Sequence, residues 1–354
     1  PLMEDPTLPI LEARHLTKEF KRYKSRPGLA GAFRDLFSRQ VTTFRAVDDV
    51  NLTLEPGEMV GYIGPNGAGK STTIKMMTGI LVPTSGDLRV NGFVPWRERE
   101  RFVRTIGVVF GQRSQLWWDI AVRESYSLLQ KIYRVPDDQY RRHFGELVDV
   151  LGLSELMDIP VRKLSLGQRM RCELAAALLH NPPLVFLDEP TIGLDVVVKL
   201  RIREFLHDVN RRYGTTILLT THDLSDIEAL CQRVVILDQG RILYDGGLDD
   251  LRRDWAGERV VRMQFAQPVP ALAEPLTAAA LDSDSQPLLG RLPVRWTKED
   301  DLTWEAVLTD QHLTVSDFLA LVASYHPVRD ISVVETRLEE VIRRIYEGGE
   351  PHGA

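Results

Sequence analysis

The sequence predicts an α/β fold built around a parallel β-sheet, with a second, smaller α+β domain. Short, continuous apolar runs alternate with helical patterns through residues 9–247. Such runs are typical of strands in a parallel sheet that helices cover on both faces. A glycine-rich loop joins one of these strands to a helix, and the pattern changes after residue 247. We therefore expect one domain over residues 9–247 and another over residues 256–347.

Composition limits the kind of protein. With 354 residues, 44% hydrophobic and 27% charged, the chain can bury a sizeable core. Its net charge of −6 gives no electrostatic argument for a nucleic-acid partner. No run approaches the roughly 18 consecutive apolar residues of a membrane helix, so we expect any membrane role to act through a partner. Cys172 and Cys231 match no metal-ligand spacing and are interpreted as reduced packing residues.

The first two strands flank a basic insertion. Strand patterns cover residues 10–16 and 46–54, and the second ends at a Glu-Pro-Gly turn. Residues 21–45 between them hold seven Lys or Arg and one acid. The insertion is interpreted either as a surface helix packed on its own domain or as a basic amphipathic element against lipid headgroups or a membrane partner. Its apolar positions, which share one helical face, are Leu29, Phe33, Leu36 and Phe37.

Residues 64–71, Gly-Pro-Asn-Gly-Ala-Gly-Lys-Ser, fit the P-loop pattern. They lie between an apolar strand, residues 59–63, and the start of a helix, residues 71–77, which is the geometry that a phosphate site needs. The glycines turn backbone amides toward phosphates, the lysine neutralises β/γ oxygens, the serine ligates Mg²⁺ and the next threonine bonds the α-phosphate. The predicted nucleotide-binding residues in this loop are Gly64, Asn66, Gly67, Gly69, Lys70, Ser71 and Thr72.

Two adjacent carboxylates end another predicted strand. Residues 184–187 are apolar, and Asp188 and Glu189 follow them. We expect Asp188 to hold magnesium through water, and Glu189 to orient and polarise the attacking water. Adjacent strand residues face opposite sides, so the two acids can have different roles. The alternative is a strand that simply ends in solvated acids.

A histidine and a glutamine end two further strands. His222 follows the strand at residues 216–220, so it emerges at the same carboxyl edge of the sheet, where we expect a contact to the γ-phosphate. The alternative for His222 is a structural hydrogen bond. Gln112 ends another apolar strand, and its amide is expected to reach the magnesium or the water.

The segment Leu-Ser-Leu-Gly-Gln at residues 164–168 predicts a second anion site. Ser165 is a good N-cap for a helix whose buried face carries Met170, Leu174 and Leu178. A serine hydroxyl and amides at a helix N-terminus bind anions. A second phosphate site on a chain that already has a P-loop suggests that each of two subunits closes the nucleotide of the other.

Together these motifs resemble the nucleotide-binding subunit of an ABC transporter, over about residues 9–245. The resemblance implies an ATPase that uses ATP and Mg²⁺. It also implies that Ser165, Gly167 and Gln168 form a signature that faces the γ-phosphate bound by a second copy of the chain. Asp195 would communicate between the two sites.

Two positions need comment within this resemblance. The family stacks an aromatic side chain on adenine, and Phe20 is slightly preferred over Tyr23 because the basic insertion obscures the alignment. The signature usually has glycine where this chain has Leu166. We expect hydrolysis to survive this change, with a modified interface.

The chain is most similar to bacterial ABC-2-type exporter ATPases, which implies separate membrane permeases as partners. The similarity rests on the opening Gly61–Asn66, the insertion, the run Gly111–Asp119 and the added C-terminal domain. In that subfamily Gln115–Trp118 would dock the permease, which suits two adjacent tryptophans. The alternative for Trp117 and Trp118 is core packing. The implied location is the cytoplasmic face of the inner or plasma membrane.

The C-terminal domain carries no motif that predicts chemistry. Its predicted strands cover residues 260–265, 292–297 and 302–308, and its helices residues 315–325 and 337–347. We expect packing and dimerisation, with ligand-sensing regulation as the alternative. For the whole chain, the alternatives to an exporter subunit are an importer ATPase and a soluble ABC ATPase that acts on ribosomes or DNA.

Overall fold

The computed structural model describes most of the chain and divides it into two compact units, Pro1–Leu248 and Asp249–Ala354. The predicted helical face of the basic insertion lies outside the described residues. Among the described residues, no helix is long and apolar enough to cross a membrane. The structure describes residues 8–24, 40–111, 113–255, 259–269, 294–308, 315–334 and 338–347.

A six-stranded sheet forms the centre of the first unit, in the order β5-β6-β7-β3-β8-β9. Every pairing from β5 through β8 is parallel, and only β9 runs antiparallel to its neighbour. All residues of β3 and β7 are buried, which explains their continuous apolar sequences. The predicted α/β class is thereby confirmed. The strands are β3 (Met59–Ile63), β5 (Ile106–Phe110), β6 (Leu184–Asp188), β7 (Thr216–Thr220), β8 (Arg233–Asp238) and β9 (Arg241–Gly247).

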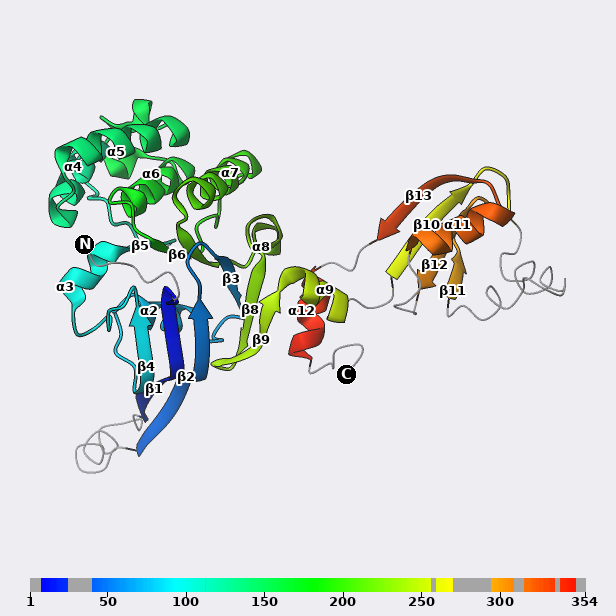
Figure 1. Cartoon of the computed structure of the whole chain (residues 1–354), viewed down its shortest axis with the longest axis horizontal. Coiled ribbons are helices and arrows are strands. Elements are labelled where there is room, and N and C mark those ends of the chain that lie inside the picture. The colour runs from blue at the N-terminus through cyan, green and yellow to red at the C-terminus, as the bar shows by residue number, and fades with distance from the viewer. Residues whose placement is uncertain are drawn as a thin grey trace, which may run out of the picture. The chain divides into compact units, whose positions relative to one another are not determined.

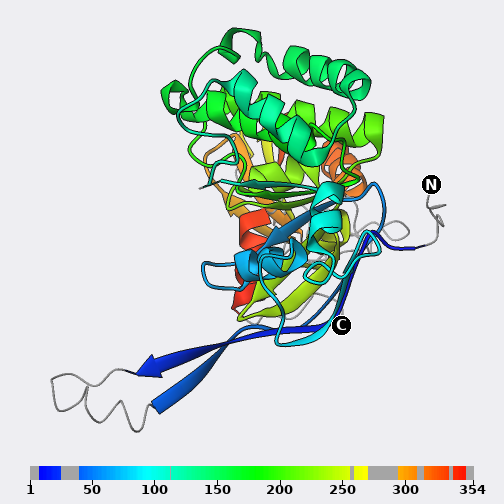
Figure 2. The ribbon, with the colours of Figure 1, turned by 90° about the vertical axis from the view of Figure 1, so that its left-hand side faces the viewer.

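A second, antiparallel sheet in this unit has the order β2-β1-β4. Its strands are β1 (Leu11–Lys24), β2 (Gln40–Leu54) and β4 (Ser85–Val90). Both β1 and β2 are longer than the patterns at residues 10–16 and 46–54 predicted, because they continue into the basic insertion as a paired ribbon. Figure 2 shows this ribbon projecting beyond the rest of the unit.

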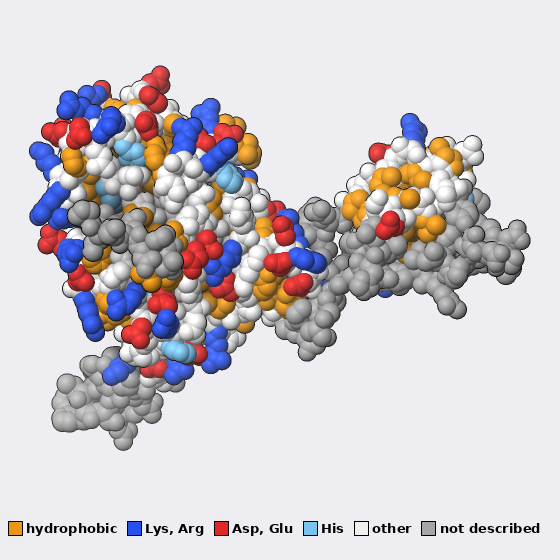
Figure 3. Space-filling view, viewed as in Figure 1, with side chains coloured by type: hydrophobic (Ala, Val, Ile, Leu, Met, Phe, Trp, Pro, Cys, Tyr) orange, Lys and Arg blue, Asp and Glu red, His pale blue; other side chains and the backbone are white. Residues whose placement is uncertain are grey.

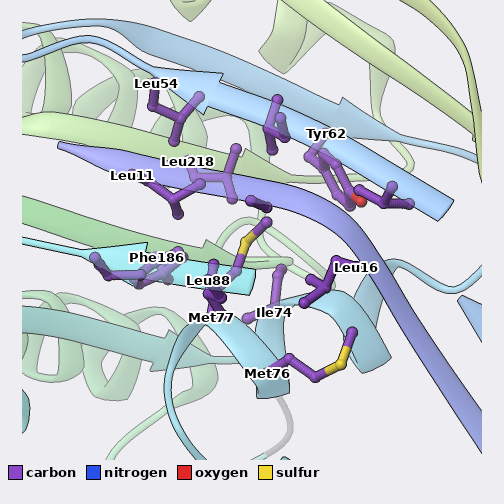
Figure 4. Close-up of a cluster of buried hydrophobic side chains, with 14 of the residues drawn as sticks. Leu11, Leu16, Leu54, Tyr62, Ile74, Met76, Met77, Leu88, Phe186 and Leu218 are labelled. Atoms are coloured by element: carbon purple, nitrogen blue, oxygen red, sulfur yellow. The ribbon is translucent and has the colours of Figure 1, made fainter. Parts of the chain in front are cut away.

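The main core lies between these two sheets and the helix that follows the P-loop. Leu11 and Leu54 from the antiparallel sheet approach Leu218 and Tyr62 from the parallel sheet, with Ile74 of the helix beside them (Figure 4). Each of these side chains is fully buried. Burying one such leucine contributes about 1.5–3 kcal/mol of stability. This packing holds α2, the helix that follows the P-loop, against the two sheets.

Helices cover the parallel sheet. Figure 1 shows α4, α5, α6 and α7 gathered on one side of it, and Figure 3 shows Lys and Arg interspersed with Asp and Glu over the same unit. Helices α4 and α5 are separate, because Arg134 adopts a left-handed conformation and Pro136 caps the second of them. The helices are α2 (Lys70–Met77), α3 (Arg99–Phe102), α4 (Val122–Tyr133), α5 (Asp137–Leu151), α6 (Leu166–Leu178), α7 (Val196–Tyr213) and α8 (Leu224–Leu230), with short 3₁₀ helices at Val103–Thr105, Ser154–Leu156 and Val161–Lys163.

Both cysteines are free and buried. Burial raises the pKa of Cys172 to about 11 and that of Cys231 to about 12. Their thiols are therefore protonated and unreactive near neutral pH, as expected of packing residues.

The second unit contains a four-stranded antiparallel sheet in the order β11-β12-β10-β13. Its core joins Val261, Met263, Trp304 and Ala306 of the sheet to Phe318 of α11. The sequence pattern missed β13, whose residues are largely exposed. Helix α9 begins at the boundary of the units. The elements are α9 (Leu248–Trp255), β10 (Arg259–Phe265), β11 (Val294–Lys298), β12 (Thr303–Leu308), α11 (Val315–Tyr325), β13 (Val328–Val334) and α12 (Leu338–Tyr346).

Candidate active site

The predicted motifs lie at the carboxyl edge of the parallel sheet. The P-loop follows β3, Glu189 follows β6 and His222 follows β7. Because β6, β7 and β3 are neighbours in the sheet, these three segments emerge side by side. This edge is where ligands bind in open α/β sheets.

The P-loop is held in a shape that only glycine permits. Gly69 has φ of 104°, and a Cβ there would lie 2.5 Å from the carbonyl oxygen of Ala46. Gly69 is also the N-cap of α2 and supplies no side-chain cap. The amides of the first turn are therefore presented to an anion, as a phosphate site requires.

Lys70 is the buried cation of this loop. Its side chain reaches back along the P-loop, and Nζ donates to the carbonyl oxygens of Gly64, at 2.5 Å, and Pro65, at 3.0 Å. The residue is only 7% exposed. Burial lowers the pKa of Lys70, while the charges of Glu189 and Asp188 oppose that change. A desolvated ammonium next to the uncapped amides at the start of a helix can bind phosphate oxygens.

Ser71 and the two carboxylates line one pocket of about 250 Å³. Asp188 occupies the last position of β6, and one of its oxygens, Oδ1, accepts a hydrogen bond from Thr220 Oγ1 at 2.6 Å. The hydroxyl and the carboxylate are hard oxygen ligands of the kind that Mg²⁺ prefers. Thr220 was not predicted as a site residue, although its place beside Asp188 in the neighbouring strand gives it this role. The pocket is lined by Ser71, Lys75, Ile80, Phe110, Gly111, Arg113, Asp188 and Glu189.

Glu189 has an unusual backbone conformation. Its φ is 56°, in the left-handed region that non-glycine residues seldom adopt, and its N–H donates to the carbonyl of Thr220 at 3.0 Å. The turn gives Glu189 a different direction from Asp188. Its Oε1 lies 2.8 Å from Nε2 of His222. The contact agrees with the expectation that these two segments emerge at one edge of the sheet.

Gln112 lies outside the described residues, so its contacts are not described. The preceding residue, Gly111, lies at the pocket, and its N–H donates to the carbonyl of Asp188 at 2.8 Å. The residue before Gln112 therefore lies beside the carboxylates of Asp188 and Glu189.

A buried glutamate secures the segment after Gln112. Glu173 of α6 accepts hydrogen bonds from Ser114 Oγ and from the N–H of Gln115 at 3.1 Å. Its pKa is raised by burial. The sequence analysis missed Glu173 because an acid within an otherwise apolar helical face carries no motif. Through this contact the signature helix holds the segment that leaves the pocket edge.

The signature segment forms a capping box. The hydroxyl of Ser165 accepts from the N–H of Gln168 at 3.2 Å, and Gln168 Oε1 accepts from the N–H of Ser165 at 2.9 Å. Neither residue lines the pocket formed by Ser71 and Asp188. The signature segment is therefore separate from this pocket in the described part of the chain.

The signature lies beside the loop that contains Asp195. Asp195 caps α7 by accepting from the N–H of Val198 at 3.0 Å. A Cβ placed on Gly193 would lie 3.0 Å from Leu166 Cδ2, and one on Gly167 would lie 3.4 Å from Val198. The unusual leucine of the signature therefore packs against the loop of its own subunit.

The aromatic residues that were expected to contact adenine or a permease are exposed. Phe20 pairs with Phe44 across β1 and β2 and is 39% exposed, with Lys18 Nζ 5.4 Å from its ring centre. The side chain of Tyr23 is not among those described. Trp117 and Trp118 are 40% and 52% exposed, which makes the core-packing alternative wrong.

Comparison with known proteins agrees with this geometry. Residues 47–192 match the family described as ABC transporter. The chain is 33% identical to the ABC transporter ATP-binding protein NatA of Bacillus subtilis, over 61% of this chain and 87% of that protein. It is 32% identical to the daunorubicin/doxorubicin resistance ATP-binding protein DrrA of Streptomyces peucetius, over 84% of this chain and 93% of that protein.

An import protein and a solved structure are also similar. The methionine import ATP-binding protein MetN of Geobacillus kaustophilus is 38% identical over 57% of this chain and 60% of that protein. A dimeric structure of a post-hydrolysis state of the ATP-binding cassette MJ0796, bound to ADP and Pi, superimposes with a TM-score of 0.56. The superposition covers 67% of this chain and 98% of the MJ0796 chain, and the two are 25% identical. The chain therefore belongs to the ABC transporter family, as one of its ATP-binding ATPases.

Proposed function

We propose that this chain powers export through separate membrane permeases, with two copies binding two ATP molecules head to tail. The observation that carries the proposal is that Glu189 lines the pocket with Ser71 and Asp188, pairs with His222 at 2.8 Å, and lies near the buried cation of Lys70. A cation for phosphate oxygens and a carboxylate for water are the two requirements of ATP hydrolysis.

Glu189 is the proposed residue that orients and polarises the attacking water. His222, whose Nε2 lies 2.8 Å from the Glu189 carboxylate, is the proposed contact to the γ-phosphate and releases Glu189 when it makes that contact. The P-loop residues Gly64, Asn66, Gly67 and Gly69 direct backbone groups to the phosphates, with Thr72 at the α-phosphate and Phe20 at the adenine. These assignments follow the motif chemistry and the shared pocket edge.

Ser71 and Asp188 are the proposed ligands of Mg²⁺, with Gln112 as a third. The described oxygens fit this ion, since both residues line the same pocket and offer oxygen alone. The metal would neutralise charge between phosphate oxygens. Thr220 holds the Asp188 carboxylate toward this position through its 2.6 Å hydrogen bond.

The surface around the signature supports closure on a second copy. Leu166, Ile192, Val196 and Val197 are 38%, 44%, 71% and 59% exposed. They surround the capped helix starts that carry Ser165 and Asp195, and Leu166 contacts the same loop. Apolar side chains beside an anion site suit an interface that forms when the partner carries ATP. In this arrangement Ser165, Gly167 and Gln168 face the partner's nucleotide.

The exposed tryptophans support docking of a permease. Trp118 lies under the guanidinium of Arg169, whose carbon is 5.8 Å from the ring centre. Arg169 belongs to the signature helix, and Glu173 of that helix holds the segment Ser114–Gln115. A partner that contacts Trp117 and Trp118 would thus act on both the signature and the edge of the pocket. We propose that the chain binds at the cytoplasmic face of the membrane in this complex.

Export is favoured over import by the extent of similarity. The match to DrrA, named for drug resistance, covers 84% of this chain, which is more than the first unit alone can supply. The matches to two MetN proteins, named for import, cover 57% and 68%, which the first unit alone can supply. We propose that residues 9–247 form the ATPase domain and that residues 256–347 form an accessory domain for dimerisation or regulation. An ABC-2-type permease is the proposed membrane partner.

The test isolates the full chain from native membranes in mild detergent and identifies the proteins that accompany it. Wild type and Glu189→Gln are compared, with Glu204→Gln as a control that changes the same charge on the exposed surface of α7. We expect polytopic permeases with all three, and ATP-stabilised dimers with Glu189→Gln alone. Ribosomal or DNA-repair partners would overturn the transporter assignment, and normal turnover by Glu189→Gln would overturn the role of Glu189.

A further inference from the structure

A fully buried carboxylate lies behind the pair formed by Glu189 and His222. Asp226 is 0% exposed and occupies the first turn of α8, where its N–H donates to the carbonyl of Asp223 at 3.0 Å. It does not line the ATP pocket. A buried carboxylate is costly unless several donors satisfy it, so its partners define what it does.

The donors to Asp226 come from three different segments. Thr191 Oγ1 donates to Oδ2 at 2.5 Å, and Thr221 Oγ1 is 3.3 Å from the same oxygen. Arg203 Nε of α7 donates to Oδ1 at 2.6 Å. Both threonines are nearly inaccessible to solvent, at 2% and 4% exposure. One carboxylate therefore joins two loops and a helix.

Each threonine is close in sequence to a residue of the reactive pair. Thr221 immediately precedes His222, and Thr191 is two residues after Glu189. Since Glu189 has a left-handed φ of 56°, its backbone depends on contacts on both sides of the turn. Asp226 provides such a contact on the far side, while Thr220 provides one on the near side.

Helix α7 holds the carboxylate in place. Arg203 also donates to Ser225 Oγ at 2.7 Å, and Lys199 pairs with Asp223 at 2.6 Å, so α7 contacts the first turn of α8 at three residues. Asp195 begins the same helix. A shift of α7 therefore has a direct route through Arg203 and Asp226 to Thr191 and Thr221.

We propose that Asp226 is a positioning residue that sets the distance between Glu189 and His222 through Thr191 and Thr221, and links that distance to α7. The inference rests on the proposed roles of Glu189 and His222. Asp226 acts through the two loops, since its carboxylate is buried beneath them. Loss of its charge allows both loops to shift while the P-loop, which it does not contact, keeps its geometry.

The experiment measures ATPase kinetics of the full chain with Asp226→Asn. We expect kcat to fall about tenfold with KM for ATP changed by less than about twofold, because displacements below 1 Å at reacting groups already cost rate. The matched control is Asp245→Asn, which breaks another Arg–Asp pair, with Arg233 Nε at 2.7 Å, away from the pocket. Asp245 is 27% exposed, so the control is expected to lose less stability than Asp226→Asn and to keep its kcat.

Combination with Glu189→Gln separates positioning from general damage. If Asp226 acts through Glu189 and His222, then Asp226→Asn lowers the residual turnover of Glu189→Gln by less than about twofold, because effects within one unit are not additive. Full multiplication of the two effects overturns the proposal, as does a kcat within twofold of wild type. If Glu189→Gln itself keeps normal turnover, the proposed base fails instead.

A gentler variant covers the case in which Asp226→Asn does not fold. Thr191→Val with Thr221→Val keeps the side-chain volume and removes the two hydroxyl donors, together with the oxygen of Thr221 that accepts from the N–H of Asp223 at 3.0 Å. The double variant is expected to lower kcat at unchanged KM, and each single variant by less. A double variant with wild-type kcat overturns the proposal.

Discussion

Nε2 of His222 lies 2.8 Å from Oε1 of Glu189. His222 follows β7 and Glu189 follows β6, and Glu189 lines the pocket with Ser71 and Asp188. In the proposed mechanism, ATP draws His222 to its γ-phosphate, and Glu189 then polarises water. In that mechanism the pair couples recognition of ATP to activation of the base.

Replacement of His222 by alanine should abolish this coupling. We expect His222→Ala to lower kcat by about 10²-fold, the scale of a positioned acid–base group, while ATP binding is retained. The measurements are steady-state ATPase rates and nucleotide affinity. His207→Ala is the control, since His207 bonds to the carbonyl of Ala229 at 2.7 Å and lies outside the pocket. A His222→Ala variant with normal turnover would refute the coupling.

Lys70→Ala should weaken ATP binding without lowering the stability of the folded protein. The ammonium is desolvated and bonded only to carbonyls of its own loop among the described residues, so its removal is expected to leave Tm unchanged or raise it. ATP with Mg²⁺ should raise Tm of the wild type, by several degrees at saturating nucleotide, and should fail to do so for the variant. Lys131→Ala on α4 is the exposed control. A normal ATP-induced shift in Lys70→Ala would count against its phosphate role.

The sequence predicted the strand edges of this site well because each motif ends a buried, continuous apolar strand. Strands β3, β6 and β7 coincide with their predicted positions to within a residue. The sequence could also predict that Asp188 and His222 share one edge, since parallel strands align their carboxyl ends. It could not predict the 56° φ of Glu189, which depends on the contacts of Thr220 and Thr191.

The sequence analysis missed other features because they depend on contacts between residues far apart in the chain. Glu173 and Asp226 are acids in helices, and only their buried partners distinguish them from surface acids. The extension of β1 and β2 arises from mutual pairing, which a basic composition does not encode. Strand β13 is mostly exposed and was missed because it lacks an apolar run. In each case tertiary contacts decided the outcome.

The contact between Leu166 and Gly193 predicts an energetic coupling. Gly193 has φ of 69°, and an added Cβ would lie 3.0 Å from Leu166 Cδ2. Gly193→Ala should destabilise the protein by about 1–2 kcal/mol, mostly from the left-handed backbone. Leu166→Ala removes the clash but not the backbone strain, so the penalty should shrink by about 0.5 kcal/mol in that background. Denaturant unfolding of both single variants and the double variant measures this, and strict additivity would show that the two residues are independent.

Acid should destabilise the first unit through His180. This imidazole stacks on Tyr133 with ring centres 4.0 Å apart, and its Nε2 donates to the carbonyl of Ile106 at 3.0 Å. Its buried Nδ1 has no hydrogen-bond partner among the described residues, so a second proton would have no acceptor. Burial lowers the pKa of His180 from 6.5 to about 4.

The sign of the pH effect follows from proton binding. Between pH 6.5 and about 4 the unfolded chain binds a proton that the folded chain does not, so the free energy of unfolding falls as pH drops through this window. The total loss is about 3 kcal/mol, and it becomes constant below the folded pKa. His180→Gln keeps an N–H donor for Ile106 and cannot titrate. As the pH is lowered from 6.5 to 5, the unfolding free energy of the wild type should therefore fall steadily relative to that of His180→Gln. Most carboxylates titrate below this range. A difference that stays flat over this range would show that His180 is protonated in the folded protein.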